Sequence, residues 1–312
     1  MAISSSSGAG PGKAPVGGGR MNDFPELSYA NPGDPWHVRA IIGVMERWAG
    51  RGYFVPLYRR WREEVIPRGP PVMRPVLDLC DVDLQTFGAW PAVIAEGVPL
   101  VIVANHPFGI LDGFAALTLA EEIGRPFRVL INKDLMKVPE IRPYSLPVDF
   151  AETKAAQAAN LRMRNEAIAL LKQGVTIVVF PAGGVATAPS AFARAVDLPW
   201  KTFTARMIQA SGAQVLPVCF EGQCSPLFHV ASRINLTLRL SLMIREFRRM
   251  VGGTVKAHVG SVIQPAELAG SKDRLMLNEM LFERVHMLGG VSPEAARAQA
   301  ELLPDHLTGR DR

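Results

Sequence analysis

Short apolar runs alternate with amphipathic segments through most of this chain. A continuous apolar run is typical of a strand that is buried on both faces of a sheet. Such a run occupies residues 99–104, and further strands are predicted over residues 127–132, 175–180, 214–220 and 255–263. Helical periodicity covers residues 112–124 and 155–174, each ending in a glycine, and it returns after Ser271. Because strands and helices alternate, the sequence predicts an α/β fold with a central, mostly parallel β-sheet flanked by helices.

The N-terminal quarter of the chain follows a different pattern. Two helices are predicted over residues 34–50 and 53–65, and the proline-rich segment 67–75 is predicted to be a linker. The second helix mixes aromatic side chains with arginines, a composition that suits a helix lying at a lipid interface. It suits equally a helix that packs on the core while its arginines are solvated. The sequence therefore predicts an N-terminal helical extension and leaves its contact with a membrane open.

These patterns divide the chain into four segments. Residues 1–20 are rich in Gly, Ser and Pro and are expected to form a flexible tail, with Met21 as an alternative start. Residues 21–75 form the helical extension, residues 76–270 the α/β domain, and residues 271–312 a C-terminal helical segment.

Composition narrows the class of protein. Of the 312 residues, 48% are hydrophobic and 20% are charged, which fits a globular chain with a sizeable core. The net charge of +5 is compatible with nucleic acid, an anionic lipid surface or a phosphorylated substrate as partner. The sequence contains no run of about 18 apolar residues, so no membrane-spanning helix is predicted. The N-terminus also lacks the apolar stretch of a secretory signal. Three cysteines without zinc-site spacing favour a reducing compartment and predict no metal site.

Unusual loops follow three of the predicted strands. They read "NHPFGILDG" (residues 105–113), "PAGGVAT" (residues 181–187) and "EGQCSPLF" (residues 221–228). Ligands of open α/β sheets bind beyond the carboxyl ends of the strands. We therefore expect these three loops to form one site.

In the first loop, five residues separate His106 from Asp112. A neutral imidazole can take a proton from a hydroxyl, and a carboxylate on its other ring nitrogen fixes its tautomer. No GxSxG nucleophile elbow is present, so the activated hydroxyl would belong to a substrate. A structural interpretation is also open, with Asp112 as a helix N-cap and His106 in a turn.

Taken together and in this order, "NHPFGILDG", "FPAGGVA" and "LPVCFEG" resemble the motifs of the glycerolipid acyltransferases, the PlsC-like lysophospholipid acyltransferase family. The resemblance covers about residues 76–263. The later stretches "SPLFHVASRI" and "GTVKAHVGSVI" resemble the hemolysin-like and ornithine-lipid acyltransferase subgroup. The resemblance implies an O-acyltransferase that moves a fatty acyl group from acyl-ACP or acyl-CoA to the hydroxyl of a lysolipid. That thioester is a co-substrate, and no cofactor is implied.

The resemblance also implies roles for individual residues. His106 would be the general base, and Asp112 would orient it and stabilise its charge. The implied substrate-binding residues are Asn105, Gly109, Lys133, Arg142, Gly183 and Gly184. Ala182 and Val185 stand where the family has Glu and Arg, which favours a lyso-ornithine lipid or another lysolipid over lysophosphatidic acid.

The resemblance implies a cytoplasmic protein that is peripheral to the inner face of the membrane and contacts an anionic lipid surface. Nucleic acid is not expected as a partner, because the arginines at residues 245, 248 and 249 have few aromatic residues nearby. Two alternatives stay open. The first is a non-catalytic lipid-binding protein that retains the fold, and the second is a hydrolase in which His106 activates water.

Overall fold

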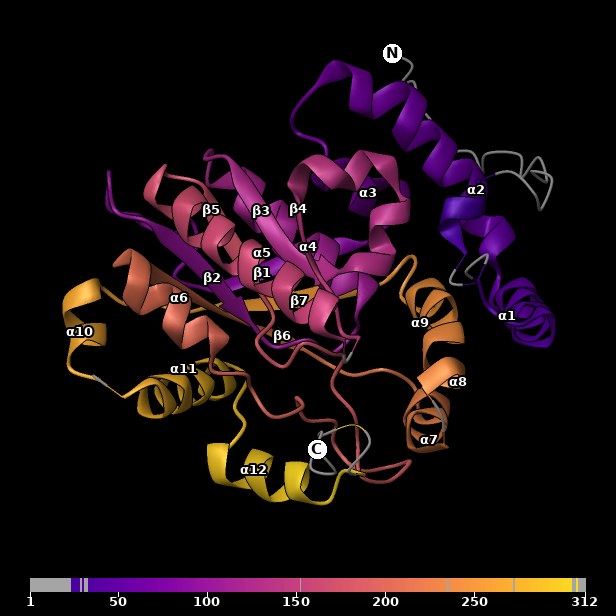
Figure 1. The fold of residues 1–312 in the computed structure, drawn as a ribbon. Coiled ribbons are helices and arrows are strands. Elements are labelled where there is room, and N and C mark those ends of the chain that lie inside the picture. Colours follow the sequence, from indigo (N-terminus) through magenta and orange to yellow (C-terminus); the bar gives the residue numbers. More distant parts are fainter. Residues whose placement is uncertain are drawn as a thin grey trace, which may run out of the picture.

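A computed structural model describes residues 24–28, 30, 33–151, 153–234, 236–271, 273–304 and 307, and one sheet runs through the centre of this part of the chain (Figure 1). Its strands are β1 (Asp83–Gly88), β2 (Leu100–Ala104), β3 (Phe127–Asn132), β4 (Ser145–Val148), β5 (Thr176–Val179), β6 (Gln214–Glu221) and β7 (Thr254–Val259). Their spatial order is β1-β7-β6-β2-β5-β3-β4, and every neighbouring pair is parallel except β6 and β7. The predicted α/β fold with a mostly parallel sheet is confirmed. The predicted tail, residues 1–20, lies outside the described residues.

Helices surround this sheet. They are α1 (Trp36–Ala49), α2 (Arg51–Arg60), α3 (Arg74–Leu79), α4 (Ile110–Glu122), α5 (Lys154–Lys172), α6 (Phe203–Ser211), α7 (Pro226–Ile234), α8 (Leu236–Ser241), α9 (Met243–Arg249), α10 (Pro265–Ala269), α11 (Arg274–Leu288) and α12 (Pro293–Glu301). Short helical turns complete the set: η1 (Pro25–Leu27), η2 (Trp61–Val65), η3 (Ile66–Arg68), η4 (Lys133–Lys137) and η5 (Pro139–Tyr144). The predicted N-terminal helices correspond to α1 and to α2 with η2. The predicted C-terminal helical segment contains α11 and α12.

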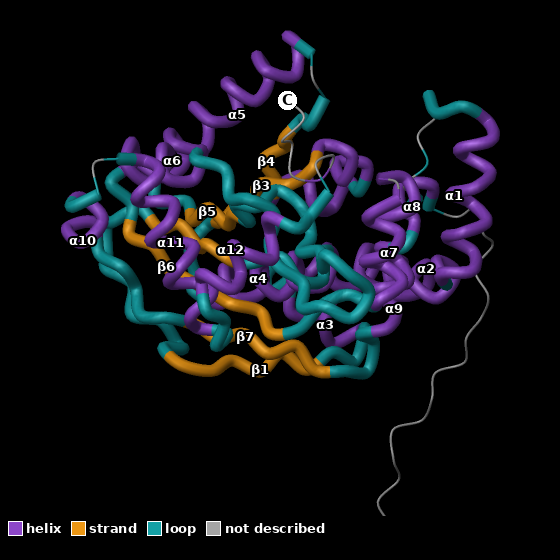
Figure 2. Tube along the Cα trace, turned by 90° about the horizontal axis from the view of Figure 1, so that it is seen from below, coloured by secondary structure: helices purple, strands orange, loops and turns teal. Residues whose placement is uncertain are grey.

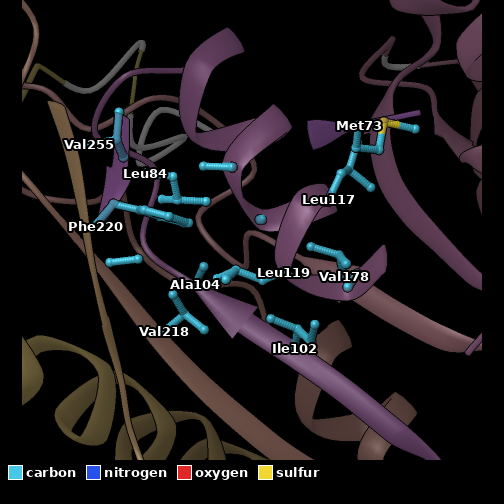
Figure 3. Close-up of a cluster of buried hydrophobic side chains, with 14 of the residues drawn as sticks. Met73, Leu84, Ile102, Ala104, Leu117, Leu119, Val178, Val218, Phe220 and Val255 are labelled. Atoms are coloured by element: carbon cyan, nitrogen blue, oxygen red, sulfur yellow. The ribbon is translucent and has the colours of Figure 1, made fainter. Parts of the chain in front are cut away.

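Strand β2 shows why both faces of the sheet need a helical layer. All five of its side chains are buried. Leu100, Ile102 and Ala104 belong to the core formed with α3 and α4 (Figure 3), whereas Val101 and Val103 belong to the core formed with α5, α6 and α11. Consecutive side chains of a strand point to opposite faces, so a continuous apolar run is buried only if both faces are covered.

The sequence does not predict β1 or β4, nor helices α3 and α6 to α10. β1 and β4 are the two edge strands of the sheet, so each pairs with one neighbour only. Leu84 is the one buried residue of β1, and β4 has four residues including Pro147. Without burial on both faces, neither strand needs the continuous apolar run by which the inner strands were recognised.

The interpretation of residues 67–75 as a linker is wrong. Val72 and Met73 are buried in the core beside α4, and α3 begins at Arg74. The carboxylate of Glu121, near the end of α4, accepts the backbone N–H groups of Val72 at 2.7 Å and Met73 at 2.9 Å. The prolines bend the chain here, but the chain lies against the core. The division of the chain at residue 75 stays a prediction.

The aromatic residues of the second helix pack on the core, which favours the core interpretation for this helix. Tyr58 and Trp61 are buried, and the indole N–H of Trp61 donates to the carbonyl of Val72 at 2.8 Å. The ring of Phe54 stacks on Phe247 of α9 with ring centroids 4.6 Å apart. Helix α1 differs, because its outer face carries exposed apolar side chains while its inner face contacts α8 and α9 (Figure 2).

Among the described residues, no helix combines the length and the apolarity that crossing a membrane requires. All three cysteines are unpaired and buried. Burial raises the pKa of Cys80 and of Cys219 to about 12, so both thiols stay protonated near neutral pH.

Candidate active site

His106 and Asp112 are brought together by the loop between β2 and α4. His106 follows β2 by two residues, and Asp112 lies in the first turn of α4. Their side chains face each other, with His106 Nδ1 3.0 Å from Asp112 Oδ1. Gly109 precedes the helix with φ of 79°, a left-handed conformation that favours glycine and turns the chain back toward the histidine.

The surroundings of Asp112 bind one carboxylate oxygen, Oδ2, and leave the other, Oδ1, facing His106. Its side chain is 0% exposed, and its Oδ2 accepts the backbone N–H of Phe108 at 2.8 Å. The N-terminal end of α4 also favours a negative charge at this position. Asp112 Oδ1 and His106 Nδ1 are buried without another hydrogen-bond partner, and their mutual contact is close but not well aligned. Catalytic hydrogen bonds are often misaligned before substrate binds. The alternative interpretation of Asp112 as the N-cap is wrong, because Gly109 occupies that position and Asp112 accepts an N–H from Phe108, which precedes the helix.

The ring of His106 packs against an aromatic side chain on one face and is partly exposed to solvent elsewhere. It stacks on Phe180, directly after β5, with ring centroids 4.2 Å apart. The side chain is 18% exposed, and among the described residues no group hydrogen-bonds its Nε2. With Nδ1 turned to a carboxylate, Nε2 is the nitrogen that can accept a proton from a substrate hydroxyl.

The three loops that were expected to form one site lie against one another beside His106. The glycine loop contacts His106 itself, and Cys224 of the third loop lies 3.4 Å from the carbonyl of Pro107. The carbonyl of His106 accepts the N–H of Ala186 from the glycine loop at 2.7 Å. The neighbouring Asn105 binds the end of β6 with its side chain, donating to the carbonyl of Phe220 at 3.0 Å and accepting its N–H at 2.7 Å. Asn105 thus shapes the loop, and its contact with substrate stays a prediction.

Gly183 and Gly184 lie in the loop after β5, and each has a steric reason to be glycine. Gly183 has φ of 68°, and a Cβ on Gly184 would lie 3.0 Å from the side chain of Leu198. The buried guanidinium of Arg239 on α8 donates to the carbonyl of Val185 and to the hydroxyl of Thr187. Arg239 therefore fixes the loop on its buried side, while Gly183 is exposed.

Lys133 and Arg142 are exposed and are engaged near β3 and β4. Lys133 pairs with Asp149 at 2.8 Å, and this hydrogen bond lowers the pKa of Asp149. The Nε of Arg142 donates to the carbonyl of Met136 at 2.7 Å. Within the described chain neither cation contacts His106, so the structure does not bring them into the histidine–aspartate pair. Their roles in substrate binding stay predictions.

Comparison with known proteins gives the family. The family model described as "Acyltransferase" matches residues 94–252, which include His106, Asp112 and the glycine loop. This chain belongs to that acyltransferase family. The predicted acyltransferase activity is thereby confirmed, whereas the resemblance to the ornithine-lipid subgroup stays a prediction.

Among solved structures, the acyltransferase is similar to the 1-acyl-sn-glycerophosphate (LPA) acyltransferase PlsC from Thermotoga maritima. The TM-score is 0.45 and the sequence identity is 18%, over 82% of this chain and 98% of that chain. A search of curated proteins gave no match.

One part of the acyltransferase site, Asp197, was missed by sequence reasoning. Asp197 lies between β5 and α6, is buried, and accepts the backbone N–H of His106 at 3.1 Å. A cavity of about 30 Å³ adjoins it, also lined by Asn105 and by His286 of α11. The only signal in the sequence is a single acidic residue within the apolar stretch "AVDLPW". A lone carboxylate in a loop does not indicate that it will bind a backbone group of another loop.

Gly109→Ala should lower the free energy of unfolding of the acyltransferase by about 1–3 kcal/mol. The left-handed backbone at Gly109 disfavours any side chain, and an added Cβ would collide with Met243 and come within 2.9 Å of Val185 Cγ2. Urea denaturation measures the loss. Gly113→Ala is the matched control: it lies within α4 with no atom within 4 Å of an added Cβ. Alanine there should stabilise the helix by about 0.5–1 kcal/mol. Equal effects of the two substitutions would contradict this account.

Proposed function

We propose that this acyltransferase transfers a fatty acyl group from acyl-ACP or acyl-CoA to the hydroxyl of a lysolipid, with His106 as general base and Asp112 as the carboxylate that orients it. One observation carries the proposal. The Nδ1 of His106 faces a fully buried carboxylate at 3.0 Å, while the ring remains partly exposed. This arrangement favours the tautomer whose Nε2 can accept a proton.

The proposed reaction needs no nucleophile from the protein. His106 Nε2 takes the proton of the acceptor hydroxyl as its oxygen attacks the thioester carbonyl. The new C–O ester bond forms, the C–S bond breaks, and the sulfur leaves as a thiolate that takes up the proton from His106. Asp112 stabilises the imidazolium while it exists. The products are an acylated lipid and a free thiol.

The proposed acceptor is a lyso-ornithine lipid or another lysolipid whose headgroup differs from that of lysophosphatidic acid. Ala182 and Val185 support this choice, because both side chains are apolar and buried in the glycine loop. Neither of these two side chains can therefore supply a charged contact to the headgroup.

Purified protein incubated with a thioester and a lysolipid tests the proposal. We expect release of free thiol together with the acylated lipid, detected by mass spectrometry, and the panel should contain acyl-ACP and acyl-CoA as donors. Lyso-ornithine lipid, lysophosphatidic acid and lysophosphatidylcholine serve as acceptors. Free fatty acid without acylated lipid would identify a hydrolase instead. Binding to lipid vesicles without thiol release from any pair would favour the lipid-binding alternative.

We also propose that α1 places the site at the inner face of an anionic membrane. Trp36 and Trp48 are 79% and 61% exposed, and Ile41 and Val44 are exposed between them. The guanidinium of Arg245 lies 5.3 Å from the centroid of the Trp48 ring, so a cation borders the apolar face. Apolar side chains bordered by cations suit the headgroup region of an anionic bilayer.

Replacing both tryptophans, Trp36→Ala with Trp48→Ala, should weaken binding to anionic vesicles at least about tenfold. Burying one large apolar side chain contributes about 1.5–3 kcal/mol, and 1.4 kcal/mol is a factor of ten. Vesicle sedimentation gives the affinity. The matched control is Leu275→Ala with Met276→Ala on α11, two side chains of similar exposure. Unchanged binding by the tryptophan variant, or an equal loss in the control, would show that α1 is not the docking face.

A further inference from the structure

A second buried carboxylate, Asp197, binds the backbone of the proposed catalytic histidine. Asp197 is 3% exposed. Its Oδ1 accepts the N–H of His106 at 3.1 Å, and its Oδ2 accepts the indole N–H of Trp200 at 2.8 Å. Because each oxygen accepts one N–H, an ionised carboxylate fits this arrangement.

Trp200 links this carboxylate to α11. The carbonyl of Trp200 accepts the side-chain amide of Asn278 at 3.0 Å, and its ring packs edge-on against Phe282 with centroids 5.4 Å apart. Both partners belong to α11, which lies in the same core as β2. The position of Asp197 is therefore fixed by a helix far along the chain from His106.

Other charged and titratable groups surround Asp197. His286 of α11 faces it across the cavity, and its Nδ1 lies 2.8 Å from the carbonyl of Phe282, so this nitrogen carries a proton. The cavity is also lined by Glu221 and Cys219 of β6 and by Arg194, which lies in the same loop as Asp197. Burial raises the pKa of Asp197, while the charge of His286 and the two N–H donors act in the opposite direction.

We propose that Asp197 is a positioning residue of this acyltransferase: it anchors the backbone of His106 so that the ring keeps Nδ1 on Asp112 and Nε2 toward the acceptor. The proposal rests on the general-base role of His106 given above. Asp197 touches neither the ring nor any reacting atom, so it acts through the histidine. Its removal leaves the His106 N–H unpaired and frees the loop between β2 and α4 to shift. A displacement of about 1 Å at a catalytic group can lower a rate about 10²-fold.

Steady-state kinetics of Asp197→Ala and Asp197→Asn separate positioning from a general loss of stability. We expect Asp197→Ala to lower kcat about 10- to 100-fold, with KM for the thioester within about threefold. Asp197→Asn keeps one acceptor oxygen for the His106 N–H but turns its N–H₂ toward the indole N–H of Trp200, so it should recover part of kcat. Glu121→Ala is the matched control, since Glu121 also accepts backbone N–H groups, from Val72 and Met73, at the other end of α4. It should keep the wild-type kcat.

Nitrogen-15 NMR of histidine-labelled protein tests the same proposal without acyl transfer. The ring signals of His106 are assigned by their loss in His106→Ala. We expect one dominant tautomer, protonated at Nδ1, in the wild type, and a mixture of tautomers in Asp197→Ala. Wild-type kcat or unchanged His106 signals in Asp197→Ala would overturn the proposal, as would an equal loss of kcat in Glu121→Ala. If Asp197→Ala does not fold, Trp200→Phe takes its place. It removes the N–H that holds Asp197 Oδ2, so we expect a smaller loss of kcat and a partial mixture of His106 tautomers, and wild-type behaviour of this variant would overturn the proposal. A wild type that is inactive with every lysolipid would refute the proposed function and leave this NMR test intact.

Discussion

His106→Ala should lower kcat for acyl transfer by about 10²–10⁴-fold, the usual contribution of a general base, while the fold is retained. The substitution removes the nitrogen that deprotonates the acceptor in the proposed reaction. It also removes the ring contact with Phe180, but the carboxylate of Asp112 keeps its bond from the N–H of Phe108. Thiol release and thermal denaturation, measured on the same preparation, separate catalysis from stability.

His258→Ala provides the control for this experiment. His258 lies on β7, stacks on Phe87 and pairs with Glu221 at 3.2 Å, and among the described residues it has no contact with His106. Its loss should leave kcat within about threefold of the wild type, as is usual for a polar residue outside the site. If His106→Ala retained wild-type turnover, the general-base mechanism would be wrong.

Burial on both faces accounts for most of the strands that could be predicted; β7 was predicted as well, although only one of its faces is buried. The inner strands β2, β3, β5 and β6 lie between two helical layers, and this position forces the apolar runs that the sequence displays. The edge strands β1 and β4 carry no such run and were missed. Prolines misled the interpretation of residues 67–75, because a proline marks a break in a helix and says nothing about burial.

The proximity of His106 and Asp112 could be predicted because His106 lies in the short loop after a recognisable strand and Asp112 lies in the first turn of the helix that follows. Asp197 could not, because its partner is a backbone N–H, and backbone groups leave no pattern in a sequence. The orientation of α2 was equally hidden. Its aromatic residues and arginines suit a core or a lipid surface, and only the stacking of Phe54 on Phe247 separates the two interpretations.

Asp112→Asn should lower kcat by about 10²–10⁴-fold with little change in volume, because the amide selects the wrong tautomer of His106. The remaining oxygen is needed to accept the N–H of Phe108, so the amide N–H₂ must face His106 Nδ1. That nitrogen then has to accept a hydrogen bond, which places the ring proton on Nε2. An Nε2 that already carries a proton cannot take one from the acceptor hydroxyl. Raising the pH should not restore the rate, because the defect lies in the tautomer and not in the charge.

The double variant His106→Ala with Asp112→Asn tests whether the carboxylate acts through the histidine. If it does, the double variant should lose at most about threefold more than His106→Ala alone, because residues that act as one unit are not additive. Glu121→Gln, a carboxylate at the other end of α4, should show additive behaviour with His106→Ala. Multiplied losses for the Asp112 pair would mean that the carboxylate contributes independently of the imidazole, and the 3.0 Å contact between the two side chains would then not explain the chemistry.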